Sequence, residues 1–544
     1  MSATSALSGG VGAAEALRAF DVDVVFTLSG GHLFPLFDGC VQRGIRLVDT
    51  RHEQTATFAA EGWAKVTRRP GVAALTAGPG ITNGVSAITA ASMNGSPMLV
   101  IGGRAPAARW GAGSLQELDP LPILGSVTKS ATTATETAAV GSVVADALTT
   151  AMTPHRGPTF VDVALDVFFA SAPAPDAFDP TIARVAPDPD DLAAITALVA
   201  RAERPVLVVG ADVYWGRAET AMRAFVETAR VPTIVNGLGR GTIPSDHELA
   251  FSRARSAAFR DADLVVVAGT PLDFRLGFGD FGAAQVVHMA DSPTGVATHV
   301  QLAAAAAGDL ELVFSGLVEA WPDAPGTRPD HEAWVARLDE IEMAARAADA
   351  VALESAATPI HPLRIYGELR KRLARDAVVV GDGGDFVSYA GKYVDTFTPG
   401  CFLDPGPYGC LGMGPGYALA AALARPDRQV VLLLGDGATG FSLGDFDTLV
   451  RFGVNVVAVI GNNGIWGLEK HPMQAVYGYD VAAELRPGTR YDQVAEALGA
   501  HGELVSEPNA IGPALDRAFA AGGLSVVNVL TDPGDAYPRS SNLA

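Results

Sequence analysis

Hydrophobic residues along this chain fall into short runs separated by Ala-rich stretches with helical spacing. Twelve such runs, for example VLVV at 206–209 and VVLLL at 430–434, have little or no polar alternation. Continuous apolar runs are typical of strands that are buried on both faces, as in parallel sheets covered by helices. The alternation of runs with helical stretches predicts an α/β fold. The runs are DVVFTL, GVAALTA, PMLVIGG, TFVDVAL, PVLVVGA, PTIVNG, ADLVVVAG, QVVHMA, DAVVVGDG, QVVLLLGDG, VNVVAVIGN and LSVVNVL.

Two stretches rich in Pro and Asp interrupt this alternation. They cover residues 171–191 and 319–332, and their composition is typical of linkers. They predict three α/β units, at 1–175, 190–330 and 355–544, with a helix over 332–353 leading into the third. A chain of 544 residues is long enough for this number of domains.

The charge and cysteine content narrow the class of protein. The formal net charge of -21 argues against nucleic acid or an anionic membrane as a partner. The three cysteines show no metal-ligand spacing and fit reduced thiols in a cytosol. With no signal peptide and no membrane-spanning run, we expect a soluble, cytoplasmic protein that acts on a small molecule.

The third unit carries the most specific chemical signal. Gly435, Asp436 and Gly437 follow one apolar run, and Asn462 and Asn463 follow the next, 24 residues later. Adjacent parallel strands end at the same edge of a sheet, where open α/β sheets bind ligands. Asp436 and Asn463 supply hard oxygen ligands for Mg²⁺, and the glycines let the backbone approach phosphates. Each motif by itself is also compatible with an ordinary turn.

Glu53 is the second unusual feature. It opens the stretch EQTATFAAEGWAK, which is otherwise mostly small or apolar, and Glu61 follows about two helical turns later. A buried carboxylate needs a partner. Glu53 could instead be a helix cap or pair with Arg51 at the surface, and we expect Glu61 to be structural, satisfied by another helix.

These motifs resemble the thiamine diphosphate (ThDP) enzyme superfamily. GDG…NN resembles its diphosphate-binding motif, RHEQ with TAGPGITN (76–83) resembles its pyrimidine-binding domain, and the three units match its pyrimidine-binding, central Rossmann-like and diphosphate-binding domains. The resemblance implies three doubly wound parallel-sheet domains and a homo-oligomer, at least a dimer and more specifically a tetramer. In this family the active site forms between two chains.

The resemblance also assigns roles to individual residues. The glutamate matching Glu53 hydrogen-bonds N1′ of the aminopyrimidine and thereby activates C2 of the cofactor. Mg²⁺ would be held by Asp436, Asn463 and the carbonyl of Ile465. Leu411 would support the bent cofactor, at a position where the family often has Met. The remaining expected cofactor contacts are Gly80, Asn83, Gly435, Gly437, Ala438 and Trp466.

Three branches of the superfamily compete. PLDFR (271–275) is similar to acetolactate synthases, in which an arginine like Arg275 contacts FAD, and His32 matches the active-site histidine of benzaldehyde-lyase-like enzymes. GAGSLQELD (111–119), ARSAAFRDADLVVVAG (254–269) and LDPGPYGCLGMGPGYALAAAL (403–423) resemble 2-hydroxyacyl-CoA lyases and oxalyl-CoA decarboxylases. We favour this last branch because its matches are spread over all three units.

The favoured branch implies a reaction and a second ligand. A 2-hydroxyacyl-CoA would be cleaved to formyl-CoA and an aldehyde or ketone, with His32 and Gln116 orienting the substrate; an acetolactate synthase would decarboxylate the 2-keto acid pyruvate. Arg275 and Asp291 would contact an ADP or CoA moiety in the central unit, and FAD is less expected there. A non-catalytic relative that binds a nucleotide is the alternative of another class. The tail from 532 to 544 is a candidate lid over the CoA entrance, or a frayed end.

Overall fold

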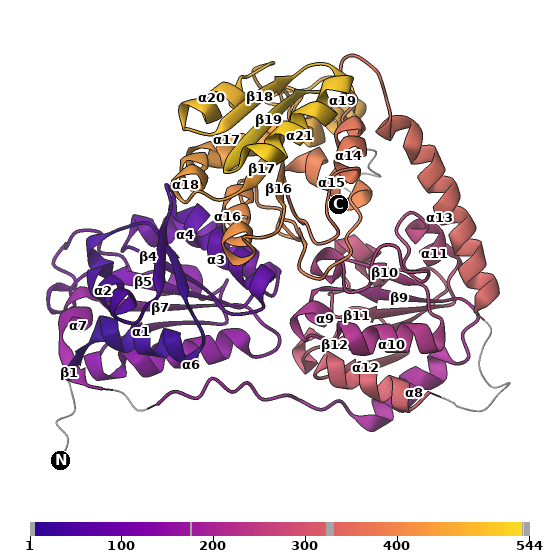
Figure 1. The fold of residues 1–544 in the computed structure, drawn as a ribbon. Helices are drawn as coiled ribbons and strands as arrows, with labels where there is room; N and C mark the ends of the chain where they lie inside the picture. The colour runs from indigo at the N-terminus through magenta and orange to yellow at the C-terminus, as the bar shows by residue number, and fades with distance from the viewer. Residues whose placement is uncertain (1–5, 175–176, 322–330, 536, 538–544) are drawn as a thin grey trace.

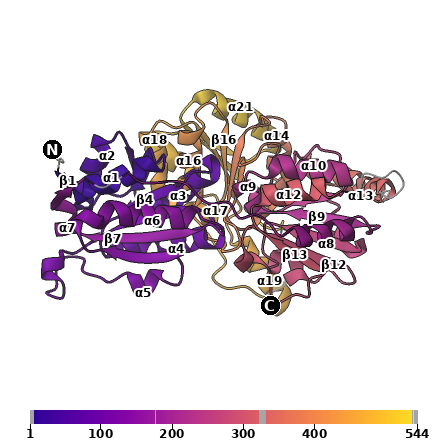
Figure 2. The ribbon, with the colours of Figure 1, turned by 90° about the horizontal axis from the view of Figure 1, so that it is seen from below.

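The computed structural model describes residues 6–174, 177–321, 331–535 and 537. They form three α/β units, each a parallel sheet with helices on both faces, which confirms the predicted fold class (Figure 1). The first unit lies at the lower left of the view, the central unit at the lower right and the third above them. Seen from below, the first and central units lie side by side, and the third unit lies between and behind them (Figure 2).

The first sheet has six strands in the order β3-β2-β4-β5-β7-β6, all parallel. Its strands are β2 (Val24–Thr27), β3 (Arg46–Asp49), β4 (Gly71–Leu75), β5 (Met98–Arg104), β6 (Ser130–Ala134) and β7 (Pro158–Ala164). Its helices include α1 (Gly9–Ala19), α2 (Phe34–Gln42), α3 (Glu53–Thr67), α4 (Pro79–Met93), α5 (Leu121–Leu124), α6 (Val140–Met152) and α7 (Leu165–Phe169).

The central sheet has five parallel strands in the order β10-β9-β11-β12-β13. The strands are β9 (Pro205–Val209), β10 (Thr233–Val235), β11 (Leu264–Ala268), β12 (Gln285–Ala290) and β13 (Ala304–Ala307). The helices around it are α8 (Pro189–Val199), α9 (Ala211–Trp215), α10 (Glu219–Ala229), α11 (Arg255–Asp261) and α12 (Leu310–Glu319).

The third sheet has six parallel strands in the order β15-β14-β16-β17-β19-β18. The strands are β14 (Val378–Asp382), β15 (Phe402–Leu403), β16 (Val430–Gly435), β17 (Val456–Asn462), β18 (His501–Val505) and β19 (Leu524–Leu530). Its helices are α14 (Leu363–Arg370), α15 (Gly384–Tyr393), α16 (Gly414–Ala424), α17 (Asp436–Ser442), α18 (Phe446–Arg451), α19 (Gly467–Tyr477), α20 (Tyr491–Ala497) and α21 (Ile511–Ala521).

The twelve predicted runs all form strands of these sheets. They account for every interior strand of the three described sheets and for one edge strand, β10. The strands that the pattern did not predict are the edge strands β3, β6, β13, β15 and β18, and the small antiparallel pair β1 (Ala6–Ser8) and β8 (Ser171–Pro173).

The segments between the units differ in part from the prediction. The stretch 171–191, expected to be a linker throughout, contains β8 and the start of α8. The predicted helix at 332–353 is α13 (Glu332–Leu353). Its Trp334, Val335 and Leu338 pack into the core of the central unit, and Leu353 packs into the third unit. The helix therefore joins the two units through its own side chains.

The first and third units meet through α3 and α16. A Cβ atom on Gly62 would lie 2.9 Å from the Tyr417 backbone, and one on Gly416 would lie 2.8 Å from the Thr55 carbonyl oxygen. These glycines let the two helices approach closely, so α3 is buried on nearly all sides. The apolar sequence after Glu53 follows from this packing, because no face of the helix is left to water.

Glu61 is a structural residue, as expected. It is fully buried and accepts hydrogen bonds from Asn94 Nδ2 (2.8 Å) and Ser96 Oγ (3.0 Å). Its carboxylate pairs with Lys65 at 3.0 Å, and Lys65 donates to the Tyr417 hydroxyl of α16. The carboxylate is thus neutralised within the joint between the first and third units.

Only the start of the tail is described. Thr531 pairs with Ile360, and the ring of Tyr537 lies 5.0 Å from that of Tyr389. Residues 536 and 538–544, and with them most of the candidate lid, lie outside the described residues. Among the residues that are described, no helix is both long and apolar enough to cross a bilayer.

Candidate active site

The predicted catalytic residues of the first unit gather at the carboxyl edge of its sheet. Glu53 begins α3 after β3 and is 7% exposed. Its Oε2 accepts a hydrogen bond of 3.0 Å from Asn83 Nδ2 on α4, which follows β4. A Cβ on Gly80 would lie 2.7 Å from Thr76 Cγ2 and 3.6 Å from Glu53 Oε1, so glycine at this position avoids a clash with Thr76. Hydrogen bonding within the described residues reaches Oε2 of Glu53, which leaves Oε1 available to a ligand.

His32 and Gln116 lie at the same edge. His32 is buried after β2, and its Nδ1 is 3.3 Å from the Thr76 hydroxyl, which follows β4. Burial lowers the pKa of His32 below its usual value, so the imidazole is neutral at pH 7. The backbone of Gln116, with φ of +60°, reaches within 2.9 Å of a Cβ built on Gly78. The fold therefore brings all three predicted catalytic residues to the ends of adjacent strands.

A pocket at the carboxyl edge of the third sheet contains the predicted metal ligands. Asp436, which begins α17, accepts from the backbone N–H groups of Gly437 (3.0 Å) and Gly464 (2.7 Å). Burial raises the pKa of Asp436 to about 6. Asn463 Oδ1 accepts from the N–H of Ile465, and both residues line the pocket. The predicted contacts Gly435, Gly437, Ala438 and Trp466 line it too.

Glycine is required where the chain turns around this pocket. A Cβ on Gly437 would be 2.5 Å from the Trp466 ring, and one on Gly383, whose φ is +89°, would be 2.6 Å from the Ala438 side chain. The start of α17 thus lies beside a narrow space bounded by the Trp466 ring. Such a space, with oxygen ligands beside it, fits a diphosphate bound together with a hard cation.

Leu411 lies between the first and third units. Its carbonyl accepts a hydrogen bond of 3.4 Å from Gln54 Nε2 of α3. The segment around it is held by Asp382, which accepts from the N–H groups of Gly412 (3.1 Å) and Gly414 (2.8 Å). Burial raises the pKa of Asp382 to about 7. Asp382 therefore fixes the turn on which Leu411 sits.

Two acidic residues of this region were missed by the sequence analysis. Asp382 stands in a second GDG, after the run DAVVV, which is the same signal that identified Asp436. Asp385, three residues later, is buried and lines the pocket. It has no comparable signal, because only the fold brings the start of α15 (Gly384–Tyr393) against α19.

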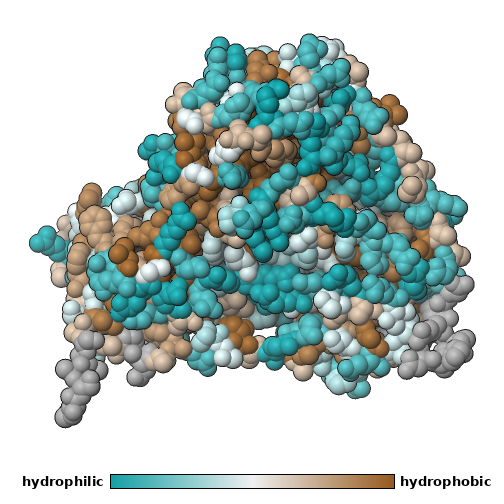
Figure 3. Space-filling view, viewed as in Figure 1, coloured by the Kyte–Doolittle hydropathy of each residue, from teal (hydrophilic) through white to brown (hydrophobic). Residues whose placement is uncertain are grey.

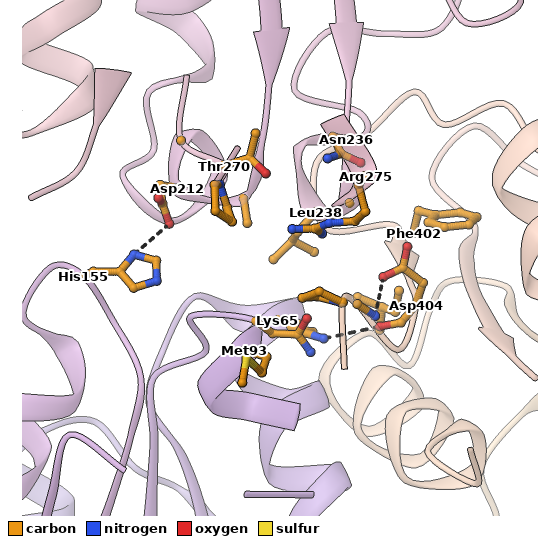
Figure 4. A pocket seen from close by; sticks show the side chains of 18 residues that line it. Lys65, Met93, His155, Asp212, Asn236, Leu238, Thr270, Arg275, Phe402 and Asp404 are labelled. Atoms are coloured by element: carbon orange, nitrogen blue, oxygen red, sulfur yellow. Dashed lines mark hydrogen bonds and ion pairs between the residues drawn. The ribbon is translucent and has the colours of Figure 1, made fainter. Parts of the chain in front are cut away.

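A second pocket opens at the carboxyl edge of the central sheet, where it meets the other two units (Figure 4). Arg275 lines it, and its guanidinium is held by the carboxylate of Asp273. Arg255 donates to the Arg275 carbonyl. Burial, together with the charges of Arg240 and Arg275, lowers the pKa of Arg255 to about 10. Three guanidiniums therefore gather beside this pocket.

Asp291 is placed behind the wall of the central pocket. His155 lines the pocket, and its Nδ1 lies 3.3 Å from Asp291 and 3.4 Å from Asp212. The Asp212 charge raises the pKa of His155 to about 10, so the imidazolium offsets one of the two negative charges. Arg156 adds a second cation 3.6 Å from Asp291. His155 and Asp212 were not predicted, because His155 comes from the first unit and only the tertiary structure brings it here.

Glu53 does not line the pocket around Asp436. That pocket is lined by residues between Gly383 and Glu469, all of the third unit. The hydrogen bonds of Glu53 are with α3 and α4 of its own unit. The residues beside it contact the third unit, since Arg51 N–H donates to Asp445 and Gln54 donates to the Leu411 carbonyl.

Comparison with known families covers all three units. The thiamine pyrophosphate enzyme models match in chain order: the N-terminal TPP-binding domain at residues 8–123, the central domain at 192–317 and the C-terminal TPP-binding domain at 382–529. The chain belongs to the thiamine pyrophosphate enzyme family. As a thiamine pyrophosphate enzyme, it uses its first and third units as the two TPP-binding domains, as the motifs predicted.

Similar curated proteins cover nearly the whole of this thiamine pyrophosphate enzyme. The chain is 55% identical to a probable acetolactate synthase of Mycobacterium bovis, over 98% of this chain and 97% of that protein. The acetolactate synthase large subunit IlvG of Mycobacterium tuberculosis shows the same identity and coverage. The human 2-hydroxyacyl-CoA lyase 2 is 33% identical, over 92% of this chain and 85% of that protein.

Proposed function

We propose that this ThDP-dependent enzyme is a carboligase of the acetolactate synthase type. It would decarboxylate one 2-keto acid, such as pyruvate, and join the remaining acyl unit to a second 2-keto acid. The observation that carries the proposal is the 55% identity to the mycobacterial proteins named acetolactate synthase. The 2-hydroxyacyl-CoA lyase reaction, which the motifs favoured, becomes the second candidate because the lyases are 33% identical.

The third unit would hold the cofactor through its diphosphate. Asp436, Asn463 and the Ile465 carbonyl offer three oxygen ligands for Mg²⁺, and the N–H groups at the start of α17 would donate to phosphate oxygens. ThDP, when bound, supplies a nucleophilic carbon and an electron sink for the acyl group. Leu411 would contact the cofactor between its two rings, on the turn that Asp382 holds.

Glu53 would hold the proton at N1′ of the aminopyrimidine. Its Oε1 faces the space beside Gly80, while Oε2 is fixed by Asn83. Because Glu53 is buried, where the local dielectric constant is low, a hydrogen bond between its Oε1 and N1′ would be stronger than the same bond in water. Asn83 is therefore a positioning residue, which keeps the carboxylate in one orientation.

His32 and Gln116 would orient the substrate. The neutral His32 imidazole has one nitrogen close to the Thr76 hydroxyl, which leaves the other for a substrate oxygen. Gln116, on the segment that follows β5, would donate to the carboxylate or carbonyl of the substrate. Both groups are uncharged, so they would bind the substrate without replacing Glu53 in proton transfer.

A complete site would need two chains. Because Glu53 does not line the Asp436 pocket of its own chain, we propose that each pairs with its complement on a second copy. Exposed apolar residues near the Asp436 pocket support this, including Phe441 (59% exposed) and Tyr477 (66%). In Figure 3 hydrophobic residues also gather where the third unit meets the first. A dimer is the smallest assembly that would bury this surface, and two dimers would make the tetramer.

The central pocket would bind an ADP moiety. Arg240, Arg255 and Arg275 gather beside it, and clustered guanidiniums suit a diphosphate. CoA and FAD both contain this moiety, so the chemistry at the pocket does not separate them. Flavin absorbance of the purified protein would identify FAD. If flavin absorbance is absent, analysis of the nucleotide released from the denatured protein would distinguish ADP from CoA.

A substrate panel tests the proposed reaction. The enzyme with Mg²⁺ and ThDP is offered pyruvate, benzoin or a 2-hydroxyacyl-CoA, and products are followed by chromatography. We expect CO₂ and acetolactate from pyruvate at a kcat/KM at least about tenfold above that of the other substrates, a difference of about 1.4 kcal/mol. Formyl-CoA as the main product would establish the lyase instead, and no turnover with any ThDP-dependent substrate would favour a non-catalytic relative.

A further inference from the structure

A cleft of about 660 Å³ lies between the first and central units, away from both pockets described above. It shares no lining residue with the Asp436 pocket or with the Arg275 pocket. Its volume is in the range of small-molecule sites, which is roughly 300–1,000 Å³. The two flanking units face each other across the lower part of Figure 1.

The cleft is basic although the protein is acidic. Four arginines line it, against the two acids Asp309 and Glu311, in a chain whose net charge is -21. Both acids are already paired with Arg184, which enters from the segment between the two units. Arg68 is paired with Glu219. The other two arginines of the lining are Arg156 and Arg217.

Arg156 and Arg217 are the incompletely neutralised charges of the cleft. Arg217 makes no ion pair within the part of the chain that the structure describes. Arg156 lies 3.6 Å from Asp291, beyond hydrogen-bond distance, and its buried Nη1 has no hydrogen-bond partner among the described residues. Burial lowers the pKa of Arg156, the charges of Asp291, Asp212 and Asp309 oppose this, and the charge of Arg217 adds to the lowering. Arg156 and Arg217 line the same cleft, and the positive charge of one is unfavourable for that of the other.

An apolar surface completes the lining. Pro97, Met152, Ala221 and Ala224 supply apolar lining.

We propose that this cleft binds a small organic phosphate. Its phosphate group would lie between Arg156 and Arg217 and accept from their N–H groups, while the organic part would contact the apolar lining. A planar guanidinium fork matches phosphate oxygens, and a dianion would relieve the repulsion between the two arginines. The ligand would touch both units and the segment carrying Arg184, so its binding would restrain the central unit relative to the first.

Titration calorimetry on the ThDP- and Mg²⁺-saturated enzyme tests the proposal, with AMP and inorganic phosphate as probes. All proteins carry Arg275→Gln, which weakens anion binding at the central pocket, and saturation with ThDP fills the Asp436 pocket. The test variant adds Arg217→Asn. Arg217 is exposed and has a φ of +54°, a backbone conformation that Asn tolerates well. The matched control adds Arg201→Gln, at an exposed arginine of the central unit that does not line the cleft.

We expect AMP to bind the parent and the Arg201→Gln control alike, and Arg217→Asn to weaken AMP binding at least about tenfold. AMP should bind more tightly than inorganic phosphate, because only AMP reaches the apolar lining. Unchanged AMP affinity in Arg217→Asn, with an unchanged Tm, would overturn the proposal. Absence of AMP binding once Arg275 is replaced would overturn it too, since the site would then be the central pocket.

Discussion

The third and central units each have a pocket at the carboxyl edge of a parallel sheet, but the acidic residues at the two pockets have different partners. Asp436 is held by backbone N–H groups and makes no ion pair within the described residues. In the central unit, Asp291 and Asp212 face the imidazolium of His155, and Arg156 lies nearby. One fold therefore produces a carboxylate that is open to a cation and another that is already neutralised.

The same contrast occurs within α3. Glu53 and Glu61 are both buried, two helical turns apart. Glu61 is neutralised by Lys65, whereas Glu53 is fixed only by the neutral amide of Asn83. Burial of a carboxylate is therefore insufficient to identify a functional residue. The nature of its partner separates the acids that are available to a ligand from those that join parts of the fold.

The largest effect should come from removing the open carboxylate of the third unit. Asp436→Ala should weaken Mg²⁺-dependent ThDP binding at least about 100-fold, since a metal ligand is lost. Asp291→Ala, at the corresponding edge of the central sheet, should leave ThDP affinity within about threefold. Fluorescence titration with ThDP in the presence of Mg²⁺ measures both. Equal losses of ThDP affinity in the two variants would show that the ion pairing of a carboxylate does not determine which pocket binds the cofactor.

Glu53→Gln should lower kcat by about 100-fold or more, because an amide cannot share a proton with N1′ as a carboxylate does. Binding of ThDP and Tm should change little. Glu61→Gln should do the reverse: it should lower Tm by several degrees, since Lys65 loses its buried partner, while the residual folded enzyme keeps most of its kcat. Steady-state kinetics and thermal unfolding of both variants separate the roles. A loss of activity below tenfold in Glu53→Gln would remove this residue from acid–base chemistry.

A smaller effect should follow from adding one methyl group to the diphosphate pocket. Gly437→Ala would place a Cβ 2.5 Å from the Trp466 ring, so the ring or the start of α17 must move. Overpacking of this kind costs about 1–3 kcal/mol, and ThDP affinity should fall about tenfold. Gly440→Ala, on the same helix, has no atom within 4 Å of the added Cβ and serves as the control. If Gly440→Ala weakens ThDP as much, crowding at Trp466 is not the cause.

The smallest effect concerns the neutralised acids of the central pocket. The folded-state pKa of His155 is raised to about 10, above the unfolded value of about 6.5. Its contribution to stability is therefore complete below pH 6.5 and is lost as the pH rises toward 10. His155→Gln should lower Tm by about 1–2 °C at pH 6 and by almost nothing near pH 10, the modest size reflecting a ring that is partly exposed to the pocket. A difference that stays constant with pH would contradict an imidazolium at this position.

How far the sequence predicted the fold depended on where each strand lies. Interior strands are covered on both faces, so they appear as uninterrupted apolar runs and were all found. The missed edge strands carry polar residues, as in SATTA of β6 and HGELV of β18, or only alanine, as in β13, or are only two residues long, as in β15. Their assignment depends on pairing with a neighbour, which a local pattern does not contain.

The candidate site divides in a similar way. Asp436 and Asn463 were predicted because each follows a buried run, and parallel strands bring such positions to one edge. Glu53 and Asn83 were predicted from the motifs that resemble the family, since β3 before Glu53 gave no apolar run. The sequence by itself thus determined three parallel sheets, their order along the chain and the family motifs in two of them. Only the tertiary structure decided that His155 and Arg156 would lie beside Asp212 and Asp291, that Lys65 would neutralise Glu61, and that Arg156 and Arg217 would line one cleft. The physical reason is that charge compensation acts between segments far apart in the chain, at distances of a few ångströms that only folding establishes.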